Sequence, residues 1–505
     1  MGELRHLLVD GRPVNHPTAR NRGVGQYTLG LLRGLQSVGA PVVALYETDA
    51  EAELLHAAIP DLTLERLDPA TVRRHVAPDS WYLATQLMLH PIPLDPVPRL
   101  ITDAGLPVAA VMYDVIPERY PEQYQLQPQA RAQVQLRGML TRTLDALLAI
   151  SQFAGNTAAE ELRFPSERIR VIGAGVGAAF QPAEVPAWPR IEGVLADDGR
   201  GVVLMVSGTD ARKNTQRMLA AWGLVAPEVR AAHRLVVVAA VNDSLRSQWQ
   251  AWVNDAGVDT EVTFTGGVTD DEVVALHQVA RLAIMPSTEE GFGLPVLEAA
   301  ACGCPVIVSN VSSLPEVLNE TAAEFDPYDT ASIARAVERA LTDEDHRKVL
   351  LAAARRAVER WTWANTGRAV MDSLAQLGPR QHRQLRLPAR RVALMGRFDD
   401  CTSGRANTAL ADAFRALPTA PEVHLLVDND GGAQPIGSAP LRFPARALGR
   451  TVHRSLFDRI VVLETNGAGR REATAPSQNS LALSSDSASD AAGLLAWLGM
   501  ADGPS

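Results

Sequence analysis

The sequence predicts an α/β protein built from parallel sheets and divided into two lobes. The clearest evidence is a βαβ unit, in which an apolar strand at 281–285 is followed by a helix at 295–301 and a second strand at 305–308. A strand, a glycine-containing turn and an apolar helix also open the chain over residues 4–35. The same order starts again at residue 202, after a proline-containing stretch without an apolar period. Strands that alternate with helices are typical of parallel sheets, and the restart indicates a second lobe.

Composition narrows the class of protein without giving its function. The 505 residues suffice for roughly two to four domains, and 46% apolar and 21% charged residues are ordinary for a globular protein. A net charge of −10 argues against a general nucleic-acid binder and gives no support to a strongly basic membrane-docking face. No apolar run has the length of a membrane-spanning helix, and the first residues, MGELRHLLVD, lack a signal-peptide pattern.

The cysteines do not indicate a disulfide framework. There are three of them, and two form the short string Cys302-Gly-Cys304. We predict that this pair packs in the core rather than forming a metal or redox site. Together with the absence of a leader pattern, this makes the cytoplasm the expected location.

The stretch Thr288–Asn310, TEEGFGLPVLEAAACGCPVIVSN, combines two carboxylates with a glycine turn. Glu290 lies in the predicted loop between strand and helix, and Glu298, with seven residues between them, lies about one turn inside the helix. Ligands of parallel sheets bind at the carboxyl ends of the strands, where this loop lies. Amides at the start of the helix suit an anion, and carboxylates accept hydrogen bonds from hydroxyl groups. The loop is therefore suited to a ligand that carries both phosphate and sugar.

Two adjacent cations, Arg212 and Lys213, mark a second candidate site. They follow Gly208 and precede a helix whose apolar positions start at Met218. The helix macrodipole disfavours positive charge at this end, so an anionic partner is expected. Almost all basic residues of the chain are arginine, with Lys213 and Lys348 the only lysines, and an ammonium does not replace a guanidinium. We therefore predict that Arg212 and Lys213 bind phosphate.

The first lobe carries weaker signals. Gly23-Val-Gly25 precedes an apolar helix, an arrangement in which backbone amides approach a phosphate, although a simple tight turn explains the same pattern. Asp114 follows the apolar strand Val108–Met112, where it either positions an acceptor hydroxyl or completes a turn at the strand end. Ser151 follows another apolar strand and is expected to cap the next helix.

The string EGFGLPVLEAAACGCPV, which starts at Glu290, resembles the E-x7-E motif of the family-4 retaining glycosyltransferases. Residues 22–35 (RGVGQYTLGLLRGL), 113–124 (YDVIPERYPEQY) and 208–214 (GTDARKN) resemble further segments of that family. The resemblance covers residues 4–377. It implies the GT-B fold, in which two Rossmann-like lobes face each other across a cleft.

The resemblance also implies a role for each candidate residue. Glu290 would contact the transferred sugar, Glu298 the ribose of the nucleotide, and Asp114 the acceptor hydroxyl, which makes Asp114 and Glu290 the catalytic candidates. Tyr113 stands where many members have histidine, so no histidine role carries over. The remaining candidates would bind the donor: Gly23, Gly25, Gly208, Arg212, Lys213, Gly266, Gly267, Gly291, Phe292, Gly293 and Leu294.

These patterns predict five segments. They are an N-terminal acceptor lobe at 1–182, a linker at 183–201, a donor lobe at 202–360, a crossover helix back to the first lobe at 361–380, and a C-terminal α/β extension at 390–505. The start of the extension echoes residues 5–46, so it is either a degenerate partial copy of a GT-B first lobe or an ordinary βαβ start. Asp428-Asn-Asp430 has the D-x-D form of a metal motif, but turns after strands favour the same residues, and we predict no metal site.

We therefore expect an enzyme that moves a sugar from a nucleoside-diphosphate sugar to a glycan, lipid-linked or small-molecule acceptor, with retention of configuration. Arg212, Lys213 and the helix start after Gly293 would stabilise the leaving diphosphate without a metal or another cofactor. Two alternatives stay open, a GT-B phosphorylase or epimerase and a catalytically silent GT-B module that serves as a partner subunit or scaffold. No nucleic-acid partner is expected, and a peripheral membrane contact and the oligomeric state are left open.

Overall fold

The computed structural model describes residues 4–16, 23–88, 96–126, 128–183 and 198–377, together with the strands between 391 and 484. They form two compact units, one of Met1–Arg66, Ala110–Ile116 and Ala146–Gly378, the other of Leu67–Ala109, Pro117–Asp145 and Pro379–Ser505. Every contact of the candidate site described below lies within the first unit. The domain boundaries expected from the sequence stay predictions.

The first sheet has seven strands in the order β3-β2-β1-β4-β5-β6-β7. They are β1 (His6–Asp10), β2 (Val42–Tyr46), β3 (Leu64–Arg66), β4 (Ser80–Ala84), β5 (Val108–Met112), β6 (Ala146–Ala149) and β7 (Ile169–Val171). The helices of this part are α1 (Gly23–Ser37), α2 (Asp49–Ala58), α3 (Pro69–His75), α4 (Arg99–Asp103), α5 (Ile116–Arg119), α6 (Pro121–Tyr124), α7 (Pro128–Arg142) and α8 (Gln152–Glu161). Strand β5, VAAVM, is buried along its whole length, because a parallel sheet is covered on both faces.

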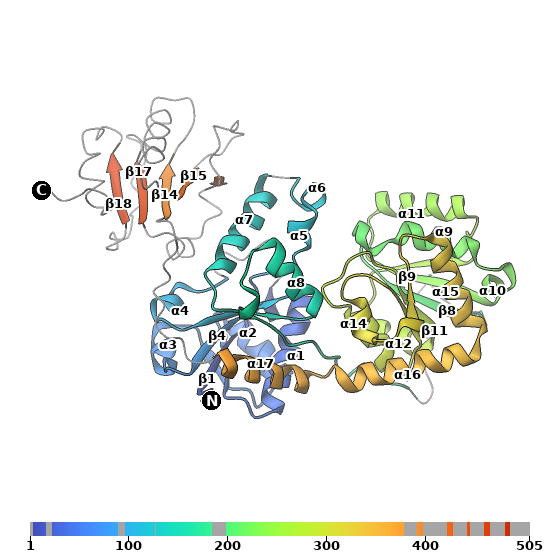
Figure 1. The fold of residues 1–505 in the computed structure, drawn as a ribbon, viewed down its shortest axis with the longest axis horizontal. Coiled ribbons are helices and arrows are strands. Elements are labelled where there is room, and N and C mark those ends of the chain that lie inside the picture. The colour runs from blue at the N-terminus through green and yellow to red at the C-terminus, as the bar shows by residue number, and fades with distance from the viewer. Residues whose placement is uncertain are drawn as a thin grey trace, which may run out of the picture. The chain divides into compact units, whose positions relative to one another are not determined.

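The second sheet has six parallel strands in the order β10-β9-β8-β11-β12-β13. They are β8 (Gly201–Val206), β9 (His233–Val238), β10 (Val262–Gly266), β11 (Ala280–Met285), β12 (Val306–Ser309) and β13 (Glu324–Phe325). The helices are α9 (Thr215–Leu224), α10 (Pro227–Ala232), α11 (Asp243–Ala256), α12 (Asp270–Val279), α13 (Leu294–Ala301), α14 (Leu314–Leu318), α15 (Thr330–Thr342) and α16 (Glu344–Arg360). Figure 1 shows helices on both faces of this sheet. The βαβ unit expected at 281–308 is confirmed as β11-α13-β12, whose strands pair in parallel.

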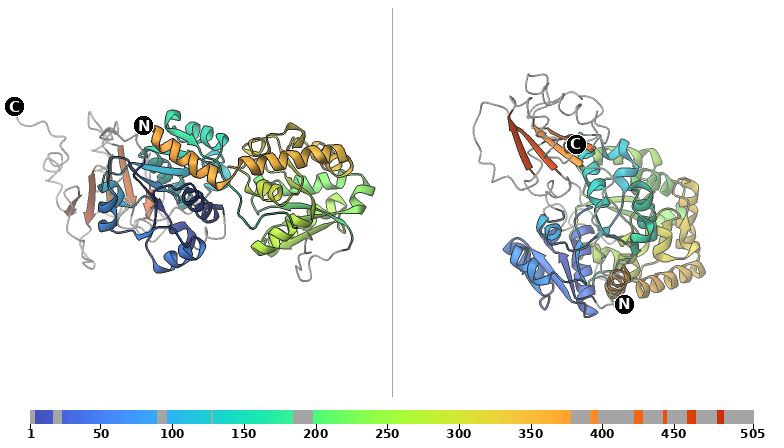
Figure 2. Two further views of the ribbon diagram at one scale, coloured as in Figure 1. Left: turned by 90° about the horizontal axis from the view of Figure 1, so that it is seen from below. Right: turned by 60° about the vertical axis from the view of Figure 1, so that its left-hand side comes forward.

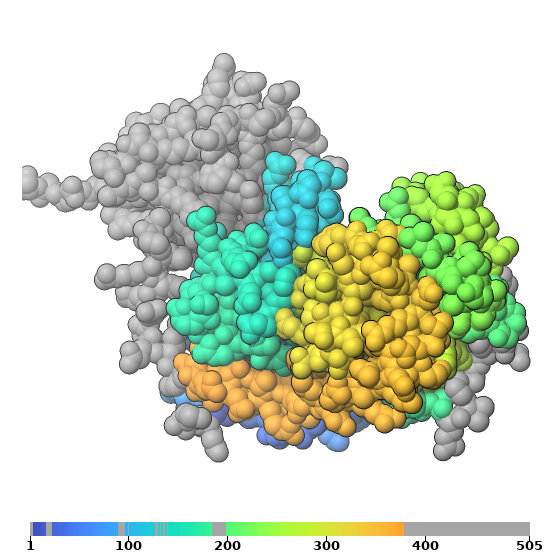
Figure 3. Space-filling model, turned by 45° about the vertical axis from the view of Figure 1, so that its right-hand side comes forward, coloured from blue at the N-terminus to red at the C-terminus, as the bar shows by residue number. Residues whose placement is uncertain are grey.

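Helix α17 (Trp363–Leu377) follows α16 and packs on α1 of the first sheet. Figures 2 and 3 show the two orange helices, α16 and α17, following one another along the molecule. Gly30 and Gly34 of α1 leave the room for this contact, since a Cβ on either glycine would lie 2.1 Å from an atom of Trp363. The indole of Trp363 also stands edge-on to Tyr27, with ring centroids 5.0 Å apart. A small-residue face on α1 therefore fixes where the chain returns to the first sheet.

The C-terminal extension contains a third, parallel sheet in the order β16-β15-β14-β17-β18. Its strands are β14 (Arg391–Gly396), β15 (Glu422–Val427), β16 (Arg442–Pro444), β17 (Arg459–Glu464) and β18 (Ser480–Ser484). The first five strands of both other sheets have the same order, so the extension is built on the same plan. Its origin as a partial copy of the first lobe stays a prediction. The D-x-D string at 428–430 lies outside the described residues.

None of the helices in the described ranges is long and apolar enough to cross a membrane.

Candidate functional site

The candidate site lies at the carboxyl ends of β8 and β11, which are neighbours in the second sheet. A 3-10 turn, Ala211–Lys213, follows β8, and the loop that contains Glu290 follows β11. Backbone contacts join these two loops. The amide of Thr288 donates to the carbonyl oxygen of Arg212 over 2.8 Å, and the Arg212 guanidinium donates to the carbonyl oxygen of Glu289 over 2.8 Å. The loop of Arg212 and Lys213 and the loop of Glu290, which the sequence indicated as two separate candidate sites, are therefore joined by hydrogen bonds into one site.

The centre of the site is an ionic cluster of Glu290, Arg212 and Lys213. Oε2 of Glu290 accepts from Nη1 of Arg212 over 2.8 Å, and Oε1 accepts from Nζ of Lys213 over 2.6 Å. Glu290 is only 8% exposed. Burial acts to raise the pKa of this carboxyl, but the two cations outweigh it and lower the pKa to about 2. The anionic partner expected for the cation pair is thus, in this structure, a carboxylate of the same chain.

Asp114 lies beside this cluster. A Cβ placed on Gly291 would lie 2.2 Å from the carbonyl oxygen of Tyr113 and 3.2 Å from Cβ of Asp114, so the two segments are in direct contact. Asp114 also joins Glu290 and Asp210 in raising the pKa of Arg212, against the effect of burial. Its Oδ1 accepts from the amide of Ile116 over 3.1 Å, which is the turn role that the sequence left open beside the acceptor role. The half-buried carboxylate therefore holds a turn and faces the site.

Glu298 occupies a different electrostatic environment from Glu290. It lies in the second turn of α13, where burial and the nearby Asp270 raise its pKa to about 7. His277 of α12 places Nε2 4.0 Å from Oε2 of Glu298. The ring of His277 is buried, neither nitrogen makes a hydrogen bond within the described part of the chain, and burial lowers its pKa to about 4. Near neutral pH this histidine is therefore uncharged, and Glu298 is close to its titration midpoint.

The glycines of the first lobe were expected in a loop, and that expectation is wrong. Helix α1 begins at Gly23, so Gly23 and Gly25 lie in its first turn. The amides of a first helical turn have no partner within the helix, so an ordered helix start presents the donors. Tyr27, one turn further on, stands edge-on to Tyr113 with ring centroids 5.2 Å apart. This contact places the start of α1 beside the segment that leads to Asp114.

The remaining glycines border the cluster or the turn before α12. A Cβ on Gly208 would lie 4.0 Å from Cε of Lys213. Gly266 ends β10 with a φ of +75°, a backbone conformation that favours glycine, and Gly267 is exposed next to it. The turn is adjacent to α12, whose Asp270 acts on Glu298.

The turn that starts α13 presents backbone rather than side chains. The ring of Phe292 is buried and stands edge-on to Trp361, with centroids 5.1 Å apart, so its side chain belongs to the core. Gly293 is the N-cap of α13, has a φ of 108° and makes no side-chain cap. Leu294 begins the helix and is half-buried. A ligand at this helix start would therefore meet amides of Gly293 and Leu294.

Sequence reasoning missed the serines that hold the Glu290 loop. Oγ of Ser313 donates to the carbonyl oxygens of Glu290 over 2.8 Å and of Phe292 over 2.9 Å. Oγ of Ser312 accepts from the amide of Glu290 over 3.1 Å. Ser312 has a φ of 59°, an uncommon conformation for a residue other than glycine. Two consecutive serines between β12 and α14 were the only available signal.

A second contact missed from the sequence joins α14 to the start of α8. The carboxylate of Glu316 accepts from the amides of Gln152 over 2.8 Å and Phe153 over 2.7 Å. Ser151 caps the same helix, as expected, by accepting from the amide of Ala154, and its Oγ also donates to the carbonyl oxygen of Gly291 over 2.6 Å. The start of α8 is thereby tied both to α14 and to the residue after Glu290.

Cys302 and Cys304 are buried and free, which confirms the expectation that they pack in the core. Burial raises the pKa of each thiol to about 12, so both stay protonated at neutral pH.

Part of the chain is similar in sequence to known glycosyltransferases. Residues 189–357 match the family described as glycosyl transferases group 1. Over 315 residues the chain is 30% identical to the serotype-specific mannosyltransferase WbdA of Escherichia coli, and over 231 residues it is 29% identical to the O-antigen chain mannosyltransferase B of the same species. These alignments cover 60% and 43% of this chain, and the chain spans only 37% and 57% of the lengths of the two relatives.

Solved structures give the fold. The structure of Alr3699/HepE from Anabaena in complex with UDP and glucose superposes with a TM-score of 0.55 at 15% identity, covering 74% of this chain and 100% of that one. A glycosyltransferase from Rickettsia africae superposes with a TM-score of 0.54 at 15% identity, covering 74% and 98%. Residues 189–357 therefore carry the sequence pattern of the group-1 glycosyltransferases, within a protein of GT-B fold.

Proposed function

We propose that this protein transfers a sugar from a nucleoside-diphosphate sugar to an acceptor, with retention of configuration. The observation that carries the proposal is the cluster of Arg212, Lys213 and Glu290 at the carboxyl ends of two adjacent parallel strands. Each of two cations lies within hydrogen-bond distance of a buried carboxylate, at the carboxyl end of the sheet where ligands bind. A ligand that carries a diphosphate next to a sugar could pair its phosphates with the cations and its hydroxyl groups with the carboxylate.

In this proposal the bound donor replaces the hydrogen bonds between Glu290 and the two cations. The diphosphate takes hydrogen bonds from Lys213 and Arg212, while the freed oxygens of Glu290 accept from hydroxyl groups of the transferred sugar. Negative charge grows on the diphosphate as the bond to the sugar breaks, and two prepositioned cations stabilise it at little cost in reorganisation. No side chain is assigned as a nucleophile, and the departing phosphate assists removal of the acceptor proton. No metal is needed for this charge stabilisation.

The other candidates extend the proposed donor site. Glu298 accepts from the ribose, and the turn at Gly266 and Gly267 borders the base. The helix starts at Gly23 and Gly293 add backbone amides on the side of the diphosphate, as amides at helix starts suit phosphate groups. Asp114, next to Gly291, positions the acceptor hydroxyl.

The names of the relatives suggest the sugar. Both Escherichia coli relatives are named mannosyltransferases, and one is named for the O-antigen chain. We therefore propose a mannosyl donor and a glycan or lipid-linked glycan acceptor, with a cytoplasmic location.

A donor screen tests the proposal. Thermal-shift measurements with GDP-mannose, UDP-glucose, UDP-galactose and the corresponding free nucleotides should show stabilisation by one nucleotide sugar. Mass spectrometry and NMR of the product with manno-oligosaccharide acceptors should then show one added sugar in the anomeric configuration of the donor. Lys213→Ala and Glu290→Ala proteins that keep full transfer activity would overturn the assignment of the site. A wild-type protein that binds no nucleotide sugar would favour the catalytically silent module instead, and cleavage of a glycan by inorganic phosphate would favour the phosphorylase.

A further inference from the structure

A pocket of about 640 Å³ lies between α9 and α11 of the second lobe. Its lining also includes Thr209, Asp210 and Ala211, which precede Arg212, and Thr330 at the start of α15. None of the residues predicted to bind the donor belongs to this lining. The volume is in the range of about 300–1,000 Å³ that is usual for small-molecule sites. The pocket is thus large enough for a ligand, and it adjoins the proposed donor site through Asp210 without sharing a residue with it.

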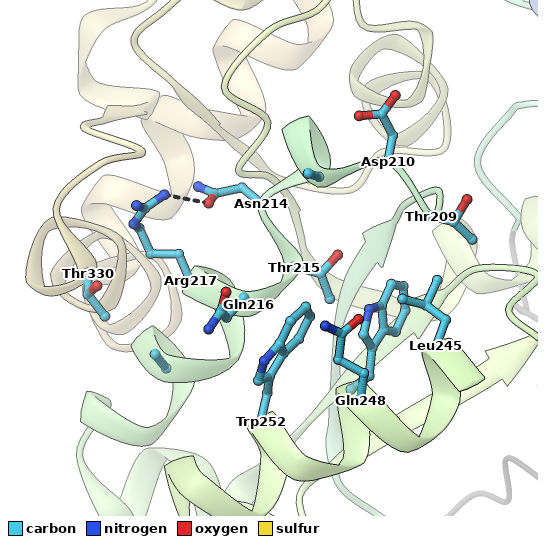
Figure 4. A pocket seen from close by; sticks show the side chains of 13 residues that line it. Thr209, Asp210, Asn214, Thr215, Gln216, Arg217, Leu245, Gln248, Trp252 and Thr330 are labelled. Carbon is cyan, nitrogen blue, oxygen red and sulfur yellow. Dashed lines mark hydrogen bonds between the residues drawn. The ribbon is translucent and has the colours of Figure 1, made fainter. Parts of the chain in front are cut away.

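An indole forms one wall of this pocket. Trp252 of α11 is half-buried, and Figure 4 shows its ring between the carboxamide side chains of Gln216 and Gln248. Trp249, one turn earlier, is 3% exposed and lies against Phe264 with ring centroids 5.4 Å apart. Trp249 therefore fixes the helix that carries Trp252 to the core. A half-exposed indole on a fixed helix offers a flat surface to the C–H face of a ring-shaped ligand.

The hydrogen-bonding groups around this indole are mostly uncharged. Thr209, Gln216 and Gln248 are exposed and can each donate and accept. The lining has one acidic and one basic side chain, Asp210 and Arg217, so it carries no excess of either charge. Nη1 of Arg217 donates to Oδ1 of Asn214 over 2.7 Å, and Oδ2 of Asp210 lies 3.5 Å from Nε of Arg212.

This combination selects the chemistry of the ligand. A phosphate or other anion would meet the carboxylate of Asp210 as well as the guanidinium of Arg217, so the lining offers it no excess of positive charge. An apolar peptide helix would leave the carboxamides and hydroxyls without hydrogen bonds, which costs free energy when they are buried. A neutral polyol matches both features, because its C–H face packs on the indole while its hydroxyl groups pair with the carboxamides. Tyr328, which is 59% exposed and lies 5.9 Å from the guanidinium of Arg217, extends the aromatic surface beyond the pocket.

We propose that the pocket between α9 and α11 binds a neutral oligosaccharide, as a second glycan site outside the donor site. Its occupant is a segment of the acceptor or product glycan, and this part rests on the proposed function. A chain held there stays attached to the protein between successive transfers, so the site favours extension of long acceptors over short ones.

Binding without a donor tests the site directly. Isothermal titration and ligand-observed NMR with linear manno-oligosaccharides, and with malto-oligosaccharides for comparison, should show saturable binding to the wild-type protein. Trp252→Ala should weaken binding at least tenfold. The double variant Gln216→Ala/Gln248→Ala, which changes only exposed side chains, should weaken it several-fold and excludes a folding defect as the cause. Leu224→Ala, which truncates a 60% exposed side chain at the end of α9 outside the pocket, should bind as the wild type does.

Two results would overturn the proposal. One is the absence of saturable binding of any neutral oligosaccharide at millimolar concentration, and the other is wild-type binding by both pocket variants. The Lys213→Ala protein separates this site from the donor site, since it should lose nucleotide-sugar binding and keep oligosaccharide binding. If no nucleotide sugar binds but oligosaccharide binding depends on Trp252, the proposed function fails while the glycan site stands.

Discussion

Lys213 and Glu290 are 77 residues apart in the chain, and Nζ of the first lies 2.6 Å from Oε1 of the second. The pair is formed because β8 and β11 are neighbours and the loops that follow them meet. Lys213 is therefore already paired with a carboxylate of the protein. Binding of a diphosphate at this lysine requires that the pair open or be shared.

The first prediction concerns the cost of breaking this pair. Glu290→Ala leaves Lys213 and Arg212 without their shared carboxylate, and hydrogen bonds to charged groups contribute about 1.5–3 kcal/mol each. We expect a free energy of unfolding lower by about 2–3 kcal/mol, measured by urea denaturation. Lys213→Ala should cost less, because Arg212 still compensates Glu290. In the double variant the two effects should not add, and strictly additive losses would show that the pair contributes nothing to stability.

The second prediction follows from the ionisation of Glu290. The pKa of this carboxyl is about 2 in the folded protein and near 4.5 when unfolded. A lowered folded pKa stabilises the protein above the unfolded value, and this contribution is lost as the pH falls from about 4.5 towards 2. The difference in the free energy of unfolding between wild type and Glu290→Gln should therefore be largest above pH 5 and shrink below pH 4. A difference that stays constant from pH 7 to pH 3 would contradict the ionic cluster.

Much of the fold follows from the sequence, because strand and helix patterns are local. The strand expected at Val108–Met112 has the same bounds in the structure, and the expected helix at 295–301 is α13, one residue longer. Apolar runs between turn residues leave little choice in a sheet that is covered on both faces. The glycine pair at 23–25 was misplaced because glycine is a poor helix former, and a strand–glycine–helix pattern does not say on which side of the glycines the helix starts.

The pairing of side chains was less predictable. Cations at a helix start indicate an anion, and a phosphate and a carboxylate satisfy that rule equally well. Only the strand order decides that Glu290 reaches Lys213. The contacts of Ser313 and Glu316 depend likewise on segments that are distant in the sequence and meet in space, and the pair of serines at 312–313 does not indicate which segment they contact.

The third prediction concerns the pH dependence of donor binding through Glu298. Burial and Asp270 raise the pKa of this carboxyl to about 7, so the folded protein favours the protonated form and loses stability as the pH rises from about 4.5 through 7. A ribose hydroxyl that donates to Glu298 favours the ionised form. The dissociation constant of the nucleotide sugar should therefore fall as the pH rises from 6 to 8, measured by isothermal titration.

Two variants separate Glu298 from its neighbour. Glu298→Gln should bind the donor more weakly at pH 8 and should lose the pH dependence, since an amide does not titrate. His277→Gln should keep it, because His277, with a pKa of about 4, is uncharged over this range. The same pH dependence in wild type and Glu298→Gln would exclude Glu298 as its origin.

The fourth prediction concerns the contact between Gly291 and Tyr113. Gly291→Ala would place a Cβ 2.2 Å from a backbone carbonyl oxygen, which cannot rotate away as a side chain can. Forced overpacking of this kind costs about 1–3 kcal/mol, so we expect a lower melting temperature and weaker donor binding. Differential scanning calorimetry and a donor titration measure the two effects.

Gly23→Ala is the matched control for this prediction. Among the residues that the structure describes, no atom lies within 4 Å of a Cβ at this position, and alanine favours a helix over glycine by about 0.5–1 kcal/mol. The variant should be as stable as the wild type or slightly more stable. If both alanine variants lose stability equally, the contact at Gly291 does not explain its effect.

The last prediction concerns Glu316, whose carboxylate accepts from the amides of Gln152 and Phe153 at the start of α8. A carboxylate at a helix start satisfies free amides and favours the macrodipole, and loss of such a cap costs about 0.5–2 kcal/mol. Glu316→Ala should therefore lower the free energy of unfolding by about 1–2 kcal/mol, and Glu316→Gln, which keeps an acceptor but removes the charge, by less.

The same change should reach the donor site, because Ser151 of this helix start donates to the carbonyl oxygen of Gly291. A loosened α8 start releases that contact, so the dissociation constant of the nucleotide sugar should rise several-fold in Glu316→Ala. Glu320→Ala is the control, since Glu320 pairs with Arg356 over 2.9 Å within the second lobe and makes no contact with α8 among the described residues. Equal effects of the two variants on donor binding would show that the α8 contact does not position the Glu290 loop.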